Sequence, residues 1–210
     1  MEQIDFFDDS FNYVGHTSID EIHQKGLWHQ GAIMKIHRIC IIGPSSSGKS
    51  TLAEKLGKKL NYPVLHMDKI AHIPNTDWQR CPIEETIQKH DAFIHQNAWI
   101  VEGNYTKMMP QRFERADLVI FHKFNRFGCV WRYICRTLRN DKNRAGILDG
   151  GTERLKWSMI KYILFKIPNR YPKYEYLFKQ YPHLKVVRVY SFKDIEKLVN
   201  EISKKNALIF

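Results

Sequence analysis

The sequence predicts an α/β fold in which a five-stranded parallel sheet carries helices on both faces. Five apolar runs alternate with segments of helical spacing, which is the pattern of a buried parallel sheet. The run at residues 36–42 leads directly into the motif GPSSSGKS, and a helix-like segment follows it. With 210 residues and 43% hydrophobic composition, the chain can bury one core of ordinary size.

The motif at residues 43–50 is a complete GxxxxGKS phosphate-binding loop. Such a loop wraps backbone N–H groups around the phosphates of a nucleotide, and the following helix points its N-terminus at them. Lys49 is expected to contact the β- and γ-phosphates and Ser50 to contact Mg²⁺. The motif therefore predicts binding of a nucleoside triphosphate, with ATP and Mg²⁺ as cofactors. The predicted binding residues are Gly43, Ser45, Ser46, Ser47, Gly48, Lys49, Ser50 and Thr51.

The second and third predicted strands each end in an acidic residue. The second strand, at residues 62–68, brings Asp68 to its carboxyl end, which is the edge where parallel α/β sheets bind ligands. Asp68 is a candidate general base or acceptor of a substrate hydroxyl, and its alternative role is to cap the next helix. The third strand, at residues 98–105, carries Glu102 followed by Gly103.

The fourth and fifth predicted strands, at residues 116–122 and 184–190, flank a basic block. Between Lys123 and Lys173 the chain has thirteen Lys or Arg and only three acidic residues. Within this block Arg132, Arg136 and Arg139 share one face of a predicted helix. Such a helical basic lid would neutralise charge on a transferred phosphoryl group, and the alternative is a solvated helix surface. We take Lys49, Asp68, Arg132 and Arg136 as candidate catalytic residues.

Two further segments complete the predicted site. A polar, glycine-containing stretch at residues 140–154 suits a lid loop, with Arg144 and Arg154 as further phosphate contacts. Trp78 and Arg80 occupy the stretch where an acceptor pocket is expected, and Trp78 is equally consistent with a core anchor.

Composition indicates the cellular compartment in which the protein is expected. The four cysteines form no CxxC pair, which favours a reducing compartment over a disulfide framework. No apolar run approaches the roughly 18 residues that a membrane span needs, and the stretch at residues 159–167 carries Lys161 and Lys166, so an amphipathic helix is predicted there. We expect a cytoplasmic protein without a membrane partner. The closing helix is predicted at residues 191–202.

Residues 1–33 differ from the rest of the chain, because they hold six acidic side chains against one lysine. Residues 3–8, 13–16 and 21–29 resemble the opening of a Nudix hydrolase domain, but the metal-binding box of that family does not follow. Pyrophosphohydrolase activity is therefore not implied. A start codon set upstream of Met34, a fusion remnant or an ordinary hairpin would each explain the segment, and we favour one of the first two. The expected division is an N-terminal extension at 1–33 and a catalytic domain at 34–210.

From Met34 to about Ile202 the chain resembles the bacterial P-loop proteins known as DNA topology modulation proteins, a branch similar to adenylate and shikimate kinases. The resemblance implies a fold like that of P-loop nucleoside monophosphate kinases and ATP binding. The adenylate kinase comparison implies that Glu102, which stands where an Asp is usual, orders water around Mg²⁺. The matching pieces are residues 43–50, 65–68, 78–80, 99–105, the Arg132/Arg136 helix and residues 151–154.

Two functions are consistent with these observations. The first is ATP- and Mg²⁺-dependent phosphoryl transfer to a small-molecule or nucleotide acceptor. The second is a regulatory NTPase associated with nucleic acid, because aromatic rings lie within the basic block and base stacking with phosphate contacts is an established binding mode. We favour the kinase, since no nucleic-acid reader motif is evident in the sequence. The rings concerned are Trp131, Tyr133, Trp157, Tyr162, Tyr171, Tyr174 and Tyr176.

Overall fold

The computed structural model describes the backbone of residues 4–7, 13–17, 28–29, 36–139, 145–148, 150 and 154–207, and the side chains of those described residues that lie between 36 and 203. The chain divides into two compact units, Met1–Lys35 and Ile36–Phe210. In the first unit, strand β1 (Ile4–Phe7) pairs antiparallel with β2 (Tyr13–Thr17) and with β3 (Trp28–His29).

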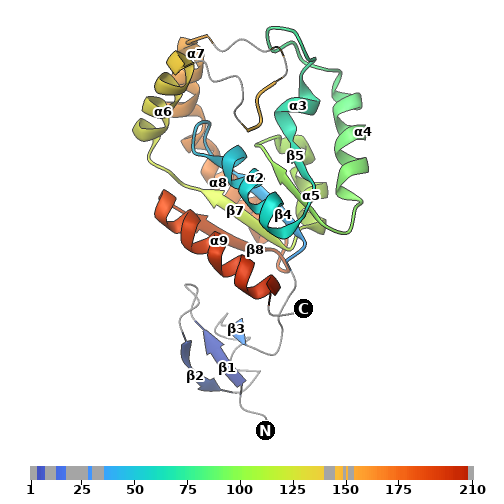
Figure 1. Ribbon diagram of the computed structural model, residues 1–210, viewed down its shortest axis with the longest axis vertical. Helices are drawn as coiled ribbons and strands as arrows, with labels where there is room; N and C mark the ends of the chain where they lie inside the picture. Colours follow the sequence, from blue (N-terminus) through green and yellow to red (C-terminus); the bar gives the residue numbers. More distant parts are fainter. Residues whose placement is uncertain are drawn as a thin grey trace. The chain divides into compact units, whose positions relative to one another are not determined.

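The second unit is built on a five-stranded sheet in the order β5-β6-β4-β7-β8, and every neighbouring pair is parallel (Figure 1). This confirms the predicted fold class. Strand β4 lies between β6 and β7, so the chain leaves β4 toward one edge of the sheet and later passes to its other side. A topological switch point therefore lies at the carboxyl end of β4, where open α/β sheets bind ligands. The strands are β4 (Arg38–Ile42), β5 (Val64–His66), β6 (Trp99–Glu102), β7 (Leu118–His122) and β8 (Lys185–Val189).

Helices pack on both faces of this sheet, and the alternation of side chains along β4 shows why. Ile39 and Ile41 join one buried cluster with apolar residues of α2, α6 and α9. Cys40 and Ile42 join a second cluster with residues of α3, α4, α5 and α8. Because successive strand residues point to opposite faces, one apolar run anchors both layers. The helices are α2 (Lys49–Leu60), α3 (Met67–Ala71), α4 (Ile83–Ile94), α5 (Met109–Arg115), α6 (Arg126–Arg139), α7 (Trp157–Lys161), α8 (Tyr171–Lys179) and α9 (Phe192–Ala207).

The second and third strands end earlier than the sequence suggested. The second strand ends at His66, and Asp68 lies instead in the first turn of α3. The third strand ends at Glu102, because Gly103 adopts a φ of 127° that leaves the extended region. Glu102 still lies at the carboxyl end of β6, and Asp68 lies two residues after the carboxyl end of the neighbouring strand β5.

The predicted amphipathic helix at residues 159–167 is interrupted. Helix α7 ends at Lys161, a π-helical turn η2 (Tyr162–Lys166) follows, and a 3₁₀ turn η3 (Pro168–Arg170) leads into α8. A single π turn of this kind widens a helix locally and is frequent at functional sites. In the described part of the chain, no helix combines the length and the apolar character required to cross a membrane.

Asp117 ties together the starts of two central strands. Its Oδ2 accepts hydrogen bonds from the backbone N–H groups of His37 and Arg38, at 2.9 and 2.8 Å. The Arg38 guanidinium also donates to Asp117 Oδ1 at 2.7 Å. One carboxylate thus satisfies two main-chain donors and a cation where β4 and β7 begin.

We predict that Asp117→Ala lowers the free energy of unfolding by about 1–3 kcal/mol, because it leaves these donors without their acceptor. Urea unfolding followed by circular dichroism measures the change. As a matched control, Lys89→Ala removes the exposed pair between Lys89 and Glu85, and we expect no measurable shift of its midpoint. Equal midpoints for Asp117→Ala and the unmodified protein would contradict this role.

Candidate functional site

The phosphate-binding loop begins at Gly43, which is held on two sides. Asn104 Oδ1 accepts from the Gly43 N–H at 2.9 Å, and Asn104 Nδ2 donates to the Gly43 carbonyl oxygen at 2.6 Å. Gly43 has a φ of 144°, and a Cβ there would lie 2.5 Å from the His122 Cβ. Only glycine fits this close approach. Packing and backbone geometry together therefore explain the first glycine of the motif.

His122 and Ser47 support the loop from beneath. The Ser47 hydroxyl donates to the Pro44 carbonyl oxygen at 2.8 Å. His122 Nδ1 lies 3.1 Å from the Ser47 carbonyl oxygen, and its ring stacks on Phe124. Burial and the nearby charge of Lys49 lower the pKa of His122 to about 3. The ring is therefore neutral at physiological pH and donates from Nδ1 to the loop.

Lys49 is the first residue of α2, where the helix N-terminus meets the loop. Its ammonium group donates to the Pro44 carbonyl oxygen at 2.8 Å. Burial lowers the pKa of Lys49, while the carboxylates of Glu102 and Asp68 act in the opposite direction. The Lys49 ammonium group is thus bonded to the loop and interacts electrostatically with the carboxylates of Glu102 and Asp68.

Glu102 is the centre of a buried network at the carboxyl end of β6. Its Oε1 accepts from the Ser50 hydroxyl at 3.0 Å and from His66 Nδ1 at 2.9 Å. His66 Nε2 lies 2.9 Å from Glu54 Oε1, so both ring nitrogens face carboxylate oxygens. Both nitrogens can donate only when the imidazole is protonated.

The electrostatics of this network agree with its geometry. Burial opposes the charged form of His66, but its hydrogen bonds to Glu102 and Glu54 outweigh that effect and raise the pKa of His66. Burial likewise opposes ionisation of Glu102, but the His66 hydrogen bond and the Lys49 charge hold the pKa of Glu102 below its usual value. Glu102 is therefore a buried carboxylate held ionised beside Ser50.

Asp68 lies across the site and is bound by Tyr105. The Tyr105 hydroxyl donates to Asp68 Oδ1 at 2.6 Å. Burial and the charge of Asp68 raise the pKa of Tyr105, so the phenol stays protonated. The helix cap of α3 is His66, so Asp68 does not serve as the cap residue.

Arg112, which is fully buried, donates to the carbonyl oxygens of Gly103 and Tyr105 and fixes the turn that carries the Tyr105 phenol.

Arg132 and Arg136 of α6 both face the site, while Arg139 is exposed and does not contribute to its lining. Arg132 Nε donates to the Ser46 carbonyl oxygen at 2.8 Å. Its guanidinium also lies over the rings of Phe124 and Phe192, at 5.5 and 5.1 Å from their centroids. A hydrogen bond therefore joins the basic helix to the phosphate-binding loop, and cation–π contacts hold the same guanidinium against Phe124 and Phe192.

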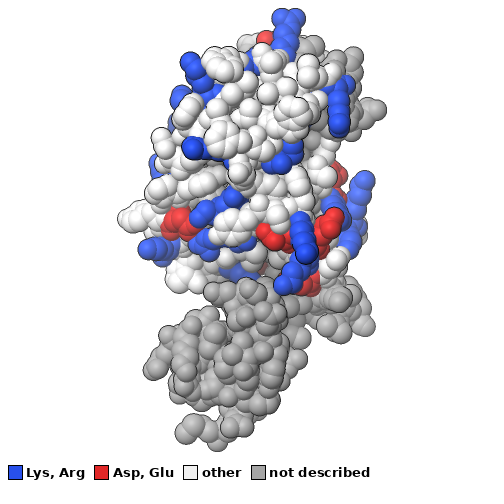
Figure 2. Space-filling view, turned by 90° about the vertical axis from the view of Figure 1, so that its left-hand side faces the viewer, with Lys and Arg blue, Asp and Glu red and all other residues white. Residues whose placement is uncertain are grey.

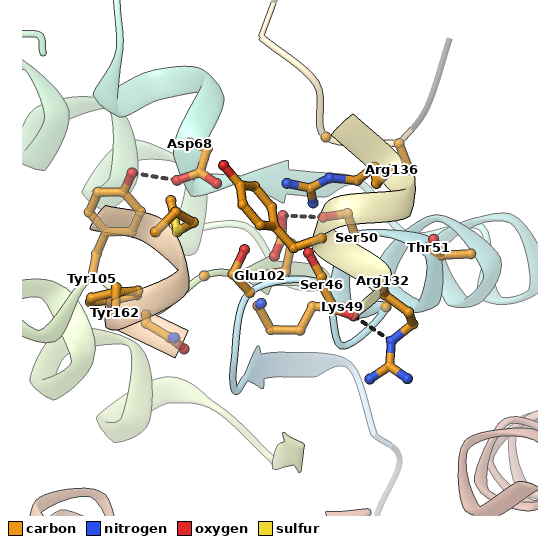
Figure 3. A pocket seen from close by; sticks show the side chains of 18 of the residues that line it. Ser46, Lys49, Ser50, Thr51, Asp68, Glu102, Tyr105, Arg132, Arg136 and Tyr162 are labelled. Atoms are coloured by element: carbon orange, nitrogen blue, oxygen red, sulfur yellow. Dashed lines mark hydrogen bonds between the residues drawn. The ribbon is translucent and has the colours of Figure 1, made fainter. Parts of the chain in front are cut away.

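Of these residues, Lys49, Ser50, Asp68, Glu102, Tyr105, Arg132 and Arg136 line one cleft of about 1400 Å³. Figure 3 shows Lys49, Ser50 and Glu102 in its middle, Asp68 and Tyr105 on one side, and Arg132 and Arg136 on the other. The cleft is thus bounded by the loop, by α3 and the turn after β6, and by α6.

Several further residues predicted from the sequence also reach the cleft. Trp78 and Arg80 line it, and Trp78 is only partly buried, which favours the pocket over the core. Arg154 lines it as well, whereas Arg144 and residues 151–153 lie outside the described residues. Among the predicted binding residues of the loop, Gly43 and Ser47 are buried, and the Ser47 hydroxyl is already bonded within the loop.

Sequence reasoning missed four residues that build the site: His66, Asn104, Tyr105 and His122. Each is a polar side chain placed at or just after the carboxyl end of a strand. Their position at strand ends was a usable signal, because those ends meet at one edge of a parallel sheet. Their partners could not be read without the order of the strands.

Comparisons with known proteins give only distant structural likenesses. No family model matches the chain, and no curated protein sequence matches it. A gluconokinase from Sinorhizobium meliloti 1021 superposes with a TM-score of 0.48 and 15% identity, over 83% of this chain and 94% of that one. A provisionally named kinase from Chloroflexus aurantiacus J-10-fl gives a TM-score of 0.48 and 15% identity, over 82% and 99% of the two chains.

The neutral His122 predicts a specific pH dependence. Its folded-state pKa of about 3 lies below the value of about 6.5 expected in the unfolded chain. The unfolded state therefore binds the extra proton first, and stability is lost as pH falls below about 6.5. Between pH 7 and pH 5 the free energy of unfolding should fall in both proteins. We expect the fall to be about 1–2 kcal/mol smaller for His122→Gln than for the unmodified protein, as measured by urea unfolding.

The test is the change in the free energy of unfolding with pH. The free energy at a single pH is not used, since the substitution also alters packing. The exposed His95→Gln serves as the control and should retain the pH dependence of the unmodified protein. The same pH dependence in His122→Gln and the unmodified protein would refute the neutral, buried imidazole.

Proposed function

We propose that the protein catalyses Mg²⁺-dependent transfer of a phosphoryl group from ATP to a small-molecule or nucleotide acceptor. The observation that carries this proposal is the position of the phosphate-binding loop, at the switch point of the sheet, between a carboxylate and two arginines. Donor phosphates and an acceptor could lie in one cleft on either side of Lys49 (Figure 3).

In this proposal the donor side consists of the loop, α2 and α6. Backbone N–H groups of the loop and the N-terminus of α2 bind the triphosphate. Lys49 exchanges its bond to the Pro44 carbonyl oxygen for the β- and γ-phosphates. Arg132 and Arg136 stabilise the charge that spreads over the γ-phosphate oxygens during transfer. Lys49, Ser50 and both arginines lie along the same cleft, which supports this division of roles.

The donor set also suits a magnesium ion. The Ser50 hydroxyl and the ionised Glu102 are hard oxygen ligands in direct contact, and Mg²⁺ prefers one or two such groups, completed by waters and phosphate oxygens. Ser50 would hold the ion and Glu102 would hold it or its water shell. The ion would supply charge neutralisation at the phosphates. Among the residues that the structure describes, no group of three or more His, Cys, Asp or Glu side chains could hold a metal ion by itself.

On the acceptor side, Asp68 would orient or deprotonate the attacking group. Its Oδ1 is bound by Tyr105, so the carboxylate has a fixed direction. The pair lies across the cleft from the arginines, which leaves the γ-phosphate between them.

The resemblance to DNA topology modulation proteins supports a second candidate, a regulatory NTPase associated with nucleic acid. Three of the rings in the basic block, Trp131, Trp157 and Tyr176, are about two-thirds exposed and could stack on bases. On the face in Figure 2, however, Lys and Arg are separated by uncharged side chains and form no continuous band. Retention on DNA with a steep negative salt dependence would favour this candidate, and no retention at moderate salt would exclude it.

We further propose that residues 34–210 form the catalytic domain and that residues 1–33 take no part in the reaction. The intact mass of the natively expressed protein tests this division. A chain that begins at Met34 would support it. A full-length chain in which changes within residues 1–33 lower the rate of transfer would contradict it.

We predict that Lys49→Ala lowers kcat/KM for ATP-dependent phosphoryl transfer by at least about 100-fold, because an electrostatic partner of the transferring group is lost. Release of ADP in a coupled assay measures the rate, and Lys58→Ala, an exposed lysine in the last turn of the same helix, is the matched control. Transfer by Lys49→Ala at the parental rate would refute the assignment.

A further inference from the structure

The cleft wall formed by α3, the loop after it and the turn after β6 has its own chemical character. We call this surface the acceptor wall, and its lining residues are Asp68, His72, Trp78, Arg80, Tyr105 and Lys107. Asp68 and Tyr105 lie across Lys49 from Arg132 and Arg136 (Figure 3). A molecule on this wall therefore approaches the transferred phosphoryl group from the side opposite the two arginines.

Asp68 indicates which group attacks. Tyr105 donates to its Oδ1, and among the described residues no hydrogen bond is made to its Oδ2. An ionised carboxylate only accepts hydrogen bonds, so its open oxygen suits a ligand that donates one. An alcohol donates an O–H and gains from a nearby base. A phosphate monoester is already largely ionised near neutral pH, needs no base and would be repelled by the carboxylate.

Arg80 and Lys107 indicate what else the acceptor carries. Their side chains make no hydrogen bond or ion pair with another described residue, yet both line the cleft beside Tyr105. The charge of Arg80 acts on the Tyr105 phenol, where it opposes the burial and the Asp68 charge that raise the pKa of Tyr105. Two cations without partners among the described residues, beside a fixed carboxylate, suit an anion on the ligand.

The loop that presents Arg80 is rigidly built. A bridge joins His72 to Arg80, and the Ile73 N–H donates to the Gln79 carbonyl oxygen at 2.8 Å. Trp78 adopts a φ of 59° and meets the His72 ring edge-on at 5.3 Å between centroids. A bulky residue in this backbone region is uncommon and persists only where its surroundings enforce it. The backbone of Arg80 is therefore fixed beside the cleft, from which its exposed side chain can reach a ligand.

The overall charge of the cleft also favours an anionic acceptor. Among its lining residues, Lys and Arg number eleven and Asp and Glu number three. This excess is greater than the magnesium complex of one nucleoside triphosphate would neutralise, so a second anion is accommodated.

We propose that the acceptor is a small hydroxylated molecule that also carries an anionic group, either a carboxylate or a phosphate ester, and that it binds with its hydroxyl at Asp68 and its anion at Arg80 and Lys107. This inference rests on the proposed kinase function. In the reaction, the hydroxyl oxygen forms a bond to the γ-phosphorus, the bond from that phosphorus to the bridging oxygen of ADP breaks, and the hydroxyl proton passes to Asp68 Oδ2. The products are ADP and a phosphate ester, and Asp68 then releases its proton to water.

The test compares matched acceptors with the full chain, ATP and Mg²⁺. Each set contains a polyol, the hydroxy acid of the same chain length and the terminal phosphate ester of that polyol, and nucleoside monophosphates complete the panel. Phosphorus NMR distinguishes a new phosphate ester from a diphosphate. We expect kcat/KM for an acid or a phosphate ester to exceed that of the matched polyol by at least about tenfold, since charge-assisted bonds are strong. The acid and the phosphate ester separate the two sources of the anion.

Substitutions at Arg80, Lys107 and Asp68 test the role proposed for each side chain. We expect Arg80→Gln and Lys107→Gln each to raise KM for the anionic acceptor by about tenfold, without changing KM for ATP or for the neutral polyol. Asp68→Asn should lower kcat by at least about 100-fold with KM for ATP unchanged. Lys69→Gln is the control, because Lys69 is exposed on the same helix and does not line the cleft.

The outcomes separate this inference from the proposed function. If the protein binds Mg²⁺–ATP in a calorimetric titration but phosphorylates nucleoside monophosphates, prefers neutral polyols or uses none of the anionic alcohols, the acceptor class is wrong and the donor site stands. If it does not bind Mg²⁺–ATP, both proposals fall. Transfer to an anionic alcohol that depends on Arg80 or Lys107 supports both.

Discussion

The site depends on one buried carboxylate, that of Glu102, at the carboxyl end of β6. An ionised acid away from water is costly unless it is paired and hydrogen-bonded. Here His66 from β5 and Ser50 from α2 donate to the same oxygen, and the Lys49 charge lies nearby. Satisfying Glu102 therefore fixes β5, β6 and the start of α2 relative to one another. If the phosphate-binding loop and the start of α2 moved away from β6, Glu102 would lose the Ser50 hydrogen bond and the nearby Lys49 charge.

The same constraint arranges the two sides of the cleft. The turn after Glu102 carries Asn104, which clamps the first glycine of the loop, and Tyr105, which binds Asp68. Buried Arg112 fixes that turn through the Gly103 carbonyl oxygen. One short segment thus connects the proposed donor side of the site to its proposed acceptor side, and such a scaffold suits a reaction in which positioning and electrostatics supply most of the catalysis.

The sequence was sufficient for the parallel sheet, because apolar runs mark the strands. The contiguous motif at residues 43–50 also located the loop on which the proposed donor side rests. Asp68 and Glu102 could also be anticipated, since the carboxyl ends of parallel strands share one edge. The pairings of His66 with Glu54, Tyr105 with Asp68 and His122 with Ser47 could not. Each joins residues on different elements, and their contact depends on the order β5-β6-β4-β7, which no local pattern encodes. The helix boundary before Asp68 was missed because a three-residue strand leaves too short a periodic signal.

The most direct test of the account is hydrogen–deuterium exchange with a non-hydrolysable ATP analogue and Mg²⁺. If the cleft binds nucleotide as proposed, saturating analogue slows exchange at the backbone amides of residues 43–51 and in the part of α6 around Arg132 and Arg136, because the loop amides then bind phosphate oxygens and the basic helix is held against them. Unchanged exchange at residues 43–51 in saturating analogue, or protection confined to other parts of the chain, would contradict the central claim that this loop is the nucleotide site.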